Sequence, residues 1–207
     1  MKLIKTDFLK NAGKLFSGSL LAQVIGFAAL IPLAQIYSPD QFGELDTYMK
    51  MAGVMVAIAG LRYEIAIVVE DDDKSAQDIT RLSLLLNAFV SFIVLLVILL
   101  FKNSIAELFK LDSPNLLYIV PPMVWLMSST DTLVSWRNRA KEYNTISTNR
   151  VLSSVSNVGY KLSHPFQTIF SGNGLVWGTI LGQVIAIIHI SRKLVFNVFD
   201  TTKDALK

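Results

Sequence analysis

Apolar residues occur along this chain in six long stretches, which polar segments separate at nearly even intervals. Each stretch is close to the about 20 residues that an α-helix needs to cross the hydrocarbon core of a bilayer. Residues 88–101 contain Ser91 as their only polar side chain, a pattern typical of a helix that faces lipid on most sides. The pattern predicts an all-α integral membrane protein with six transmembrane helices, at about 15–37, 45–69, 82–101, 116–136, 151–170 and 174–191.

Composition agrees with this class. The chain is 52% hydrophobic and 17% charged, and 16 of its 19 Lys and Arg residues lie outside the predicted spans. The net charge of +3 therefore reflects membrane topology and indicates no nucleic-acid partner. The absence of cysteine excludes disulfides and thiolate chemistry. The first apolar run is longer than the core of a secretory signal, and no flexible linker follows, so residues 1–207 are expected to form one membrane-embedded domain.

The basic residues predict an orientation. Fourteen Lys and Arg lie before the first span, in 70–81, in 137–150 and after the last span, whereas the other three connections hold only Lys102 and Lys110. Basic residues favour the cytoplasmic side of a membrane. Both termini are therefore expected to be cytoplasmic.

Two predicted spans carry polar stripes. In the second span the stripe combines charged and small residues on one helical face, namely Asp46, Lys50, Gly53, Ala57, Gly60 and Glu64. Arg62 lies on a different face from Asp46, so Arg62 and Glu64 must serve different interfaces. The fifth span carries Arg150, Ser153, Ser154, Asn157, Lys161 and His164. Such stripes line an aqueous path or pack against each other, with Lys161 neutralised by Glu64 or Asp46 in the second case.

Small residues and prolines also recur in the spans. Gly18, Ala22 and Gly26 in the first span, and Gly174, Gly178, Gly182 and Ala186 in the sixth, follow at every fourth position and predict helix-packing seams. Pro32 and the Pro121–Pro122 pair are expected to kink their helices inside the membrane.

The sequence contains little evidence of a catalytic site. Asp71–Asp73 could form the metal-binding cluster of a sugar transferase, but a solvated acidic turn between two spans explains this run. His164 and His189 lack the spacing of a metal pair, although a proton-relay role for either remains open. No phosphate-binding glycine loop, nucleophile elbow or paired catalytic carboxylates are evident. The sequence therefore favours a transporter over an enzyme, with no cofactor and no metal.

Four stretches resemble, in order, the bacterial polysaccharide (O-antigen) flippases of the multidrug/oligosaccharidyl-lipid/polysaccharide exporter superfamily. They are residues 18–43, LRYEIAI at 61–67, WRNRAKEY at 136–143 and GTILGQ at 178–183. The resemblance implies a multi-pass protein of the bacterial inner membrane. It would move a polyprenyl-diphosphate-linked oligosaccharide from the cytoplasmic to the periplasmic leaflet during the synthesis of lipopolysaccharide or another surface polysaccharide.

In this family two six-helix lobes enclose a central cavity that is often cationic. On that reading the substrate-side candidates are Arg62, Lys161, Lys50 and Asn157. The candidates for charge balance or coupling-ion binding are Asp46, Glu64 and Asp131. The matching motif contains only Arg62 and Glu64, and the other candidates follow from helical position.

The chain departs from the family in length. Members carry twelve or more spans, and six are predicted here, so the chain resembles an N-terminal half. We expect a missing second lobe or a second copy of the chain to complete the cavity. A drug or small-molecule exporter of the same superfamily is the first alternative, and a membrane-embedded polysaccharide polymerase or a non-transporting scaffold is a weaker one. The sugar composition of the substrate, the coupling ion and the oligomeric state are not evident in the sequence.

Overall fold

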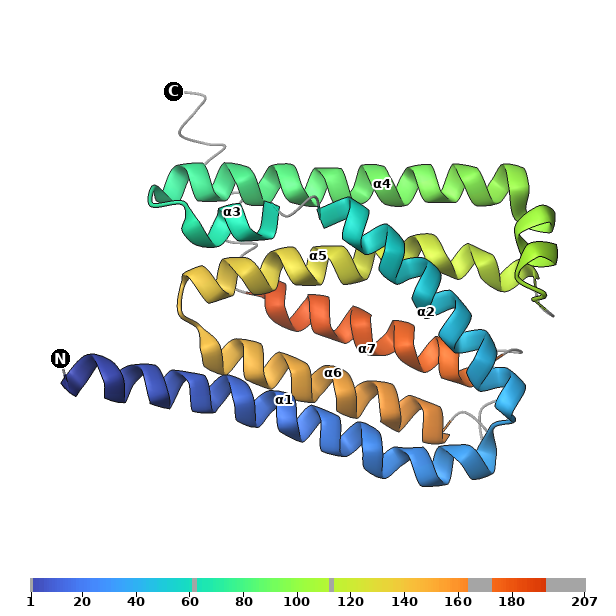
Figure 1. The fold of residues 1–207 in the computed structure, drawn as a ribbon, viewed down its shortest axis with the longest axis horizontal. Helices are drawn as coiled ribbons and strands as arrows, with labels where there is room; N and C mark the ends of the chain where they lie inside the picture. Colours follow the sequence, from blue (N-terminus) through green and yellow to red (C-terminus); the bar gives the residue numbers. More distant parts are fainter. Residues whose placement is uncertain (1, 61–62, 112–113, 164–172, 193–207) are drawn as a thin grey trace. The chain divides into compact units, whose positions relative to one another are not determined.

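A computed structural model describes residues 2–60, 63–111, 114–163 and 173–192 (Figure 1). All the regular elements in these ranges are helical. They form two compact units, one containing residues 1–36 and 133–207 and the other residues 37–132. The helices are α1 (Lys2–Ile36), α2 (Pro39–Gly60), α3 (Tyr63–Val69), α4 (Asp73–Leu108), the 3₁₀ helix η1 (Pro114–Ile119), α5 (Val120–Arg139), α6 (Tyr143–Ser163) and α7 (Gly174–Ser191).

Three of the described helices are long and apolar enough to cross a membrane: residues Gly13–Ile36, Asp73–Leu108 and Gly174–Ser191. The second predicted span is divided into α2 and α3, whose axes differ in direction by 49°. Together, as one bent span, these two helices are long and apolar enough to cross a membrane. α5 and α6 have 20 and 21 residues, but polar side chains lower their hydropathy. The all-helical membrane class is therefore confirmed, and the count of six spans stays a prediction.

In the first unit, α6 packs against both α1 and α7 (Figure 1). A Cβ atom added at Gly18 would lie 2.7 Å from the Ser147 Cα atom, and one at Gly182 would lie 3.0 Å from the Ser153 carbonyl oxygen. These glycines allow the backbones to approach closely, which confirms the two predicted packing seams. Gly26 is an exception, because a Cβ atom there would meet nothing within 4 Å.

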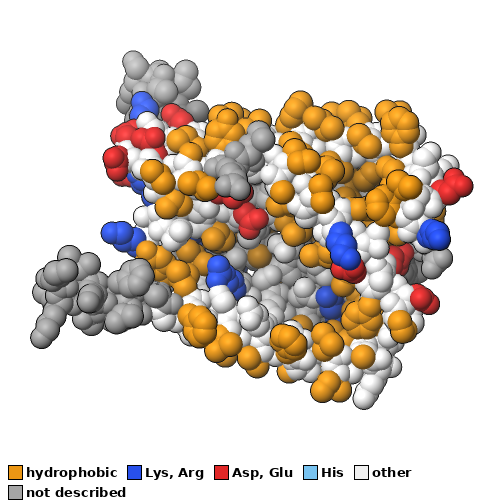
Figure 2. All heavy atoms as spheres, viewed as in Figure 1, with side chains coloured by type: hydrophobic (Ala, Val, Ile, Leu, Met, Phe, Trp, Pro, Cys, Tyr) orange, Lys and Arg blue, Asp and Glu red, His pale blue; other side chains and the backbone are white. Residues whose placement is uncertain are grey.

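In the second unit, α4 is the central helix and packs against α2, α3 and η1. Its outward surface is strongly apolar, with Leu85 69% and Leu100 76% exposed. Hydrophobic side chains cover the visible surface along α4 in Figure 2, whereas acidic side chains gather where α3 leads into α4. Lipid is the favourable solvent for such a surface, because so large an exposed apolar area is rare in soluble monomers. α4 is therefore a membrane-facing helix.

The ends of α4 and α5 share one backbone motif. Leu111 donates to the Ala106 carbonyl at 2.9 Å, and Glu142 donates to the Arg137 carbonyl at 2.9 Å. Each bond closes a Schellman turn whose left-handed residue is a lysine, Lys110 with φ 51° and Lys141 with φ 57°. Both helices therefore end without the glycine that usually signals such a stop, which explains why the sequence did not reveal these ends.

The prediction for the proline pair is wrong. Pro121 and Pro122 lie in the first turn of α5, which begins at Val120. An N–H group in the first turn of a helix has no intrahelical hydrogen-bond partner. A proline at such a position therefore removes no hydrogen bond and does not kink the helix. Pro32 does lie inside α1. An irregular residue is found instead in α4, where Phe101 has φ −121° and ψ 15° and the helix changes direction (Figure 1).

Candidate functional site

The charged half of the α2 stripe is exposed. Lys50 Nζ lies 2.5 Å from an Asp46 carboxylate oxygen, and their side chains are 75% and 60% exposed. Gly53 and Ala57, the next residues of the stripe, are exposed as well. The two charges neutralise each other one helical turn apart. Lys50 therefore presents to any ligand a cation that already has an anionic partner.

Two of the candidate acids belong to one unit. Glu64 lies in the first turn of α3, and Asp131 lies on α5. The Glu64 carboxylate lies against Gly60, where an added Cβ atom would meet the Glu64 Oε1 atom. Arg62, the cation of the same motif, lies outside the described residues.

Lys161 and Asn157 lie on the side of α6 that meets α7. Lys161 is 9% exposed, and a Cβ atom at Gly178 would lie 2.5 Å from its Cγ atom and 2.9 Å from the Asn157 carbonyl oxygen. The absence of a side chain at Gly178 makes room for the aliphatic stem of this lysine. The Asn157 Oδ1 atom is buried and has no hydrogen-bond partner among the described residues. A buried lysine and a buried amide oxygen that can still accept a hydrogen bond therefore lie about one turn apart on α6.

The remainder of the α6 stripe is divided between its two neighbours. Ser154 Oγ donates to the Ala22 carbonyl of α1 at 2.9 Å, and Arg150 contacts the Ser19 hydroxyl of the same helix. On the other edge, Ser153 Oγ donates to the Gly182 carbonyl of α7 at 3.0 Å. Much of this stripe thus binds helix backbones together. His164 lies outside the described residues.

The predicted pairing of Lys161 with Glu64 or Asp46 stays a prediction. Lys161 belongs to the first unit, and both acids belong to the second. Within the first unit, the other histidine, His189, lies with its Nδ1 atom 3.2 Å from the Asn149 Oδ1 atom. Asn149 is buried at 3% exposure. This arrangement favours a structural role for His189, since its ring nitrogen already contacts a buried amide.

The acidic run before α4 has a structural role. Asp72 is the N-cap of α4, and its carboxylate accepts a hydrogen bond of 2.8 Å from the Ser75 backbone N–H group. Carboxylates favour this position because the first N–H groups of a helix lack intrahelical partners. In the four described ranges no group of three or more His, Cys, Asp or Glu residues could hold a metal ion.

Sequence reasoning missed a buried polar layer between α4 and α5. Asn87 Nδ2 donates to Thr132 Oγ1 at 3.0 Å, and Ser91 Oγ donates to the Pro121 carbonyl at 2.7 Å. The signal was present in the most apolar helix, where polar residues recur at every third or fourth position and are all buried: Thr80, Ser83, Asn87 and Ser91. Polar groups inside and apolar groups outside are the arrangement expected of a helix bundle in lipid.

A buried arginine connects the ends of three helices in the first unit. Arg137 is 3% exposed and donates from Nε and Nη2 to the Ile190 carbonyl of α7, at 3.1 Å and 2.7 Å. Its Nη1 atom donates to Glu142 at 2.7 Å, in the turn before α6. Arg137 and Glu142 both belong to the WRNRAKEY stretch, so this part of the motif has a structural explanation.

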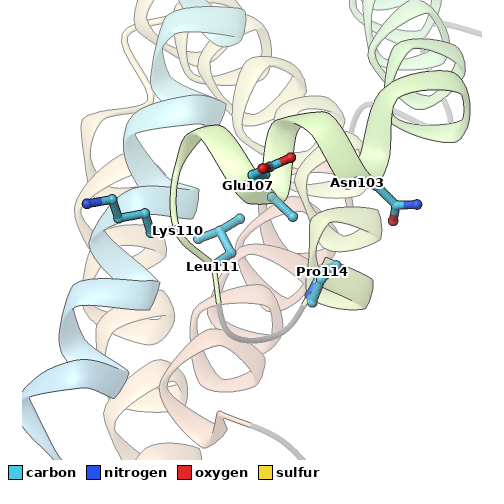
Figure 3. A pocket seen from close by; sticks show the side chains of 6 residues that line it. Asn103, Glu107, Lys110, Leu111 and Pro114 are labelled. Atoms are coloured by element: carbon cyan, nitrogen blue, oxygen red, sulfur yellow. The ribbon is translucent and has the colours of Figure 1, made fainter.

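A shallow depression of about 510 Å³ lies at the end of α4 (Figure 3). Its lining side chains include Asn103, Glu107 and Lys110, and their polar tips point in different directions. A specific ligand site needs polar groups that converge on one point. The depression therefore lacks the geometry of a binding site.

The comparisons with known proteins agree with the membrane architecture. A family described as "Polysaccharide biosynthesis protein" matches residues 8–201, nearly the whole chain. Neither a curated protein nor a solved structure matches the sequence. The exposed apolar helices, the polar residues between them and this match lead to one conclusion: the chain is a membrane protein that belongs to the polysaccharide biosynthesis protein family.

Proposed function

We propose that this chain is a six-span lobe of a flippase that moves a polyprenyl-diphosphate-linked oligosaccharide across the inner membrane. The family match over residues 8–201 supports a role in polysaccharide synthesis. The observation that carries the transport proposal is the burial of Lys161 on α6, whose neighbours α1 and α7 are both long and apolar enough to cross a membrane. An ionisable side chain buried among membrane-spanning helices is costly and commonly belongs to a substrate or ion pathway.

The chemistry of the substrate fits this cation. A diphosphate carries negative charge that needs compensation in a low-dielectric site, and charge-assisted hydrogen bonds supply it. Lys161 contributes the charge, and the Asn157 amide oxygen can accept from a sugar hydroxyl. Arg62 and Lys50 are further cations of the proposed path, while Glu64, Asp131 and Asp46 balance charge or bind the coupling ion. No covalent step is involved.

We propose that a second six-helix lobe or a second copy of this chain packs against the polar face of this lobe. A polar helix face is costly against lipid, so the exposed Asp46–Lys50 pair on α2 requires a watery cavity or a protein partner. The complete transporter would then alternate its opening between the two leaflets.

The test uses a strain that lacks its own flippase, with surface polysaccharide and cytoplasmic-leaflet lipid-linked oligosaccharide as readouts. In a complete two-lobe protein, Lys161→Ala should lower surface polysaccharide more than it lowers protein abundance. Lys161→Arg should be tolerated better, because it retains the charge. Lys74→Ala is the control, since Lys74 lies at the exposed start of α4. Normal export by Lys161→Ala at normal abundance would refute a substrate role for this cation.

The same strain distinguishes the alternatives. Accumulation of lipid-linked sugar without the protein supports the flippase, whereas altered drug susceptibility with unchanged sugar intermediates supports the small-molecule exporter. Expression of the 207-residue chain alone should not restore surface polysaccharide. Restoration by a monomeric species would refute the need for a second lobe.

A further inference from the structure

A wholly apolar cleft lies in the second unit between α2, α4 and the η1–α5 segment. Its volume is about 370 Å³, and it is partly open to the surroundings. α2 contributes two methionines and Val54, and α4 contributes five aliphatic residues between Ile93 and Ile105. Phe109, just after α4, and Leu117 and Val120 of the η1–α5 segment complete the lining. In a unit that faces lipid, hydrocarbon chains of the bilayer occupy a cleft with such an apolar lining more favourably than water molecules do.

The straight part of the cleft is shorter than one leaflet of a bilayer. Along α4 its lining runs from Ile93 to Ile98, before the irregular residue Phe101. At 1.5 Å per residue these five steps span about 8 Å, whereas the whole hydrocarbon core is roughly 30 Å thick. Beyond Phe101 the helix changes direction, and Ile105 and Phe109 line the end of the cleft. The cleft thus has room for a chain of limited length that belongs to a single leaflet.

A cationic group lies beside the end of the cleft. Lys102 directly follows the irregular residue Phe101 and lies about one turn before Ile105, which lines the cleft. The Lys102 Nζ atom donates to Asn115 Oδ1 at 2.9 Å. The ammonium also lies 5.2 Å from the centroid of the Tyr118 ring. Tyrosine and lysine are typical of the level where lipid headgroups begin. An ammonium has three N–H donors, so the bond to Asn115 leaves two for a phosphate oxygen.

We propose that this cleft is a binding site for one phospholipid of the bilayer, whose hydrocarbon chain fills the cleft and whose phosphate binds Lys102. The charge complementarity between Lys102 and the phosphate fixes the orientation, and the apolar lining supplies affinity through burial. The short straight part of the cleft favours an acyl chain over a polyprenyl chain, which is longer. The residues of this site belong to the second unit, whereas Lys161 and Asn157 belong to the first, so the site shares no residue with the proposed transport path.

The experiment measures bound lipid on the full 207-residue chain. The chain is extracted from vesicles of phosphatidylethanolamine and phosphatidylglycerol, and retained phospholipid is counted by native mass spectrometry at increasing detergent concentration. One phospholipid should remain bound. Lys102→Ala should weaken its retention about tenfold, as expected for the loss of a charge-assisted contact. Val54→Trp, which fills the cleft from its rim, should lower the occupancy by a similar factor.

Matched variants test whether these effects are local. Ile58→Trp places the same side chain one turn away on α2, where Ile58 is 51% exposed and Val54 is 58% exposed, but only Val54 lines the cleft. Lys74→Ala removes a lysine from the opposite end of α4. Both should retain the lipid. If Lys102→Ala does not fold, Lys102→Gln keeps a donor to Asn115 without the charge and should still release the lipid sooner.

Two results would overturn the proposal. Equal retention by the wild-type chain, Val54→Trp and Lys102→Ala would show that the cleft does not hold the lipid. Displacement of the bound phospholipid by an equimolar polyprenyl phosphate would show that the cleft selects the longer chain, and the proposed occupant would be wrong.

Discussion

At the scale of single residues, the absence of a side chain decides how the first unit packs. Gly178 and Gly182 of α7 lie against the backbone of α6, with the Asn157 carbonyl oxygen 2.9 Å from where a Gly178 Cβ atom would be. Contacts below 3.0 Å are avoided by real Cβ atoms, so an added methyl group must displace a backbone. The same methyl group at a glycine without close neighbours should be harmless.

This contrast gives the first prediction. Gly178→Ala should destabilise the chain by about 1–3 kcal/mol, the cost usual for overpacking. Gly159→Ala, on α6 in the same unit, should be neutral or stabilising by up to about 1 kcal/mol, because nothing lies within 4 Å and alanine favours helix. Thermal unfolding in detergent measures both. Equal effects of the two substitutions would contradict the close approach at Gly178.

Charge and depth act at the same scale. Two charged residues illustrate this: Lys50 is paired with Asp46, and the stem of Lys161 lies where Gly178 has no side chain. Pairing and burial against another helix both reduce the cost of a charge near lipid. A polar residue in such a chain is therefore best interpreted through what it contacts.

At the scale of elements, side-chain hydrogen bonds connect the ends of neighbouring helices. The Arg137 guanidinium donates to the Ile190 carbonyl in the last turn of α7 and to Glu142 before α6. Carbonyl groups in the last turn of a helix lack intrahelical donors, and a cation there also interacts favourably with the helix dipole. The arginine therefore stabilises the end of α7 and the α5–α6 turn together.

The second prediction concerns this arginine. Arg137→Ala should lower the free energy of unfolding by about 3 kcal/mol, since it leaves a buried carbonyl and a carboxylate without their donor. Arg81→Ala should cost less than about 1 kcal/mol, because its partner Asp78 is 62% exposed and such surface pairs contribute little. Thermal unfolding and protease cleavage after α7 measure the effect. A similar loss of stability in both variants would show that the buried contacts of Arg137 contribute no more than a surface ion pair.

The third prediction concerns the surroundings of α2 and α6. Ala57 on α2 and Val155 on α6 are both exposed, Val155 by 49%. If the α2 stripe faces a watery cavity and Val155 faces lipid, a small polar thiol reagent should modify Ala57→Cys and spare Val155→Cys in membranes. Ser154→Cys should react slowly, because Ser154 lies in the seam with α1. Equal modification of Ala57→Cys and Val155→Cys would contradict a hydrated α2 face.

At the scale of the whole molecule, the distribution of basic residues predicts how the chain lies in the membrane. Fourteen Lys and Arg lie in the connections predicted to be cytoplasmic, and only Lys102 and Lys110 lie in the others. Lys102 contacts Tyr118, which suits a position at the membrane surface. The orientation itself stays a prediction.

The fourth prediction tests this orientation on single-cysteine variants, which the cysteine-free chain permits. Ser38 lies between α1 and α2, and Ser75 lies in the first turn of α4. In intact cells with a permeabilised outer membrane, an impermeant thiol reagent should label Ser38→Cys and should not label Ser75→Cys. The reverse labelling would invert the topology and with it the predicted cytoplasmic termini.

Much of this molecule was evident from the sequence. Long apolar stretches predicted an all-helical membrane protein, because few other structures satisfy backbone polar groups in lipid. The spacing of Gly178 and Gly182 predicted a packing seam, since every fourth residue shares a helix face. The ordered motifs indicated the polysaccharide family, which the match over residues 8–201 shows. Each of these properties depends on local composition or spacing.

Only the tertiary structure decided what each face meets. Periodicity placed Ser153 and Ser154 on one polar stripe, yet one donates to α7 and the other to α1. The partners of Arg137 and Asn87 are 53 and 45 residues away in the chain, so no local pattern identifies them. The prolines of α5 were misjudged because their effect depends on where the helix begins. Helical spacing determines which residues share a face, whereas packing between distant segments determines whether that face meets lipid, water or another helix.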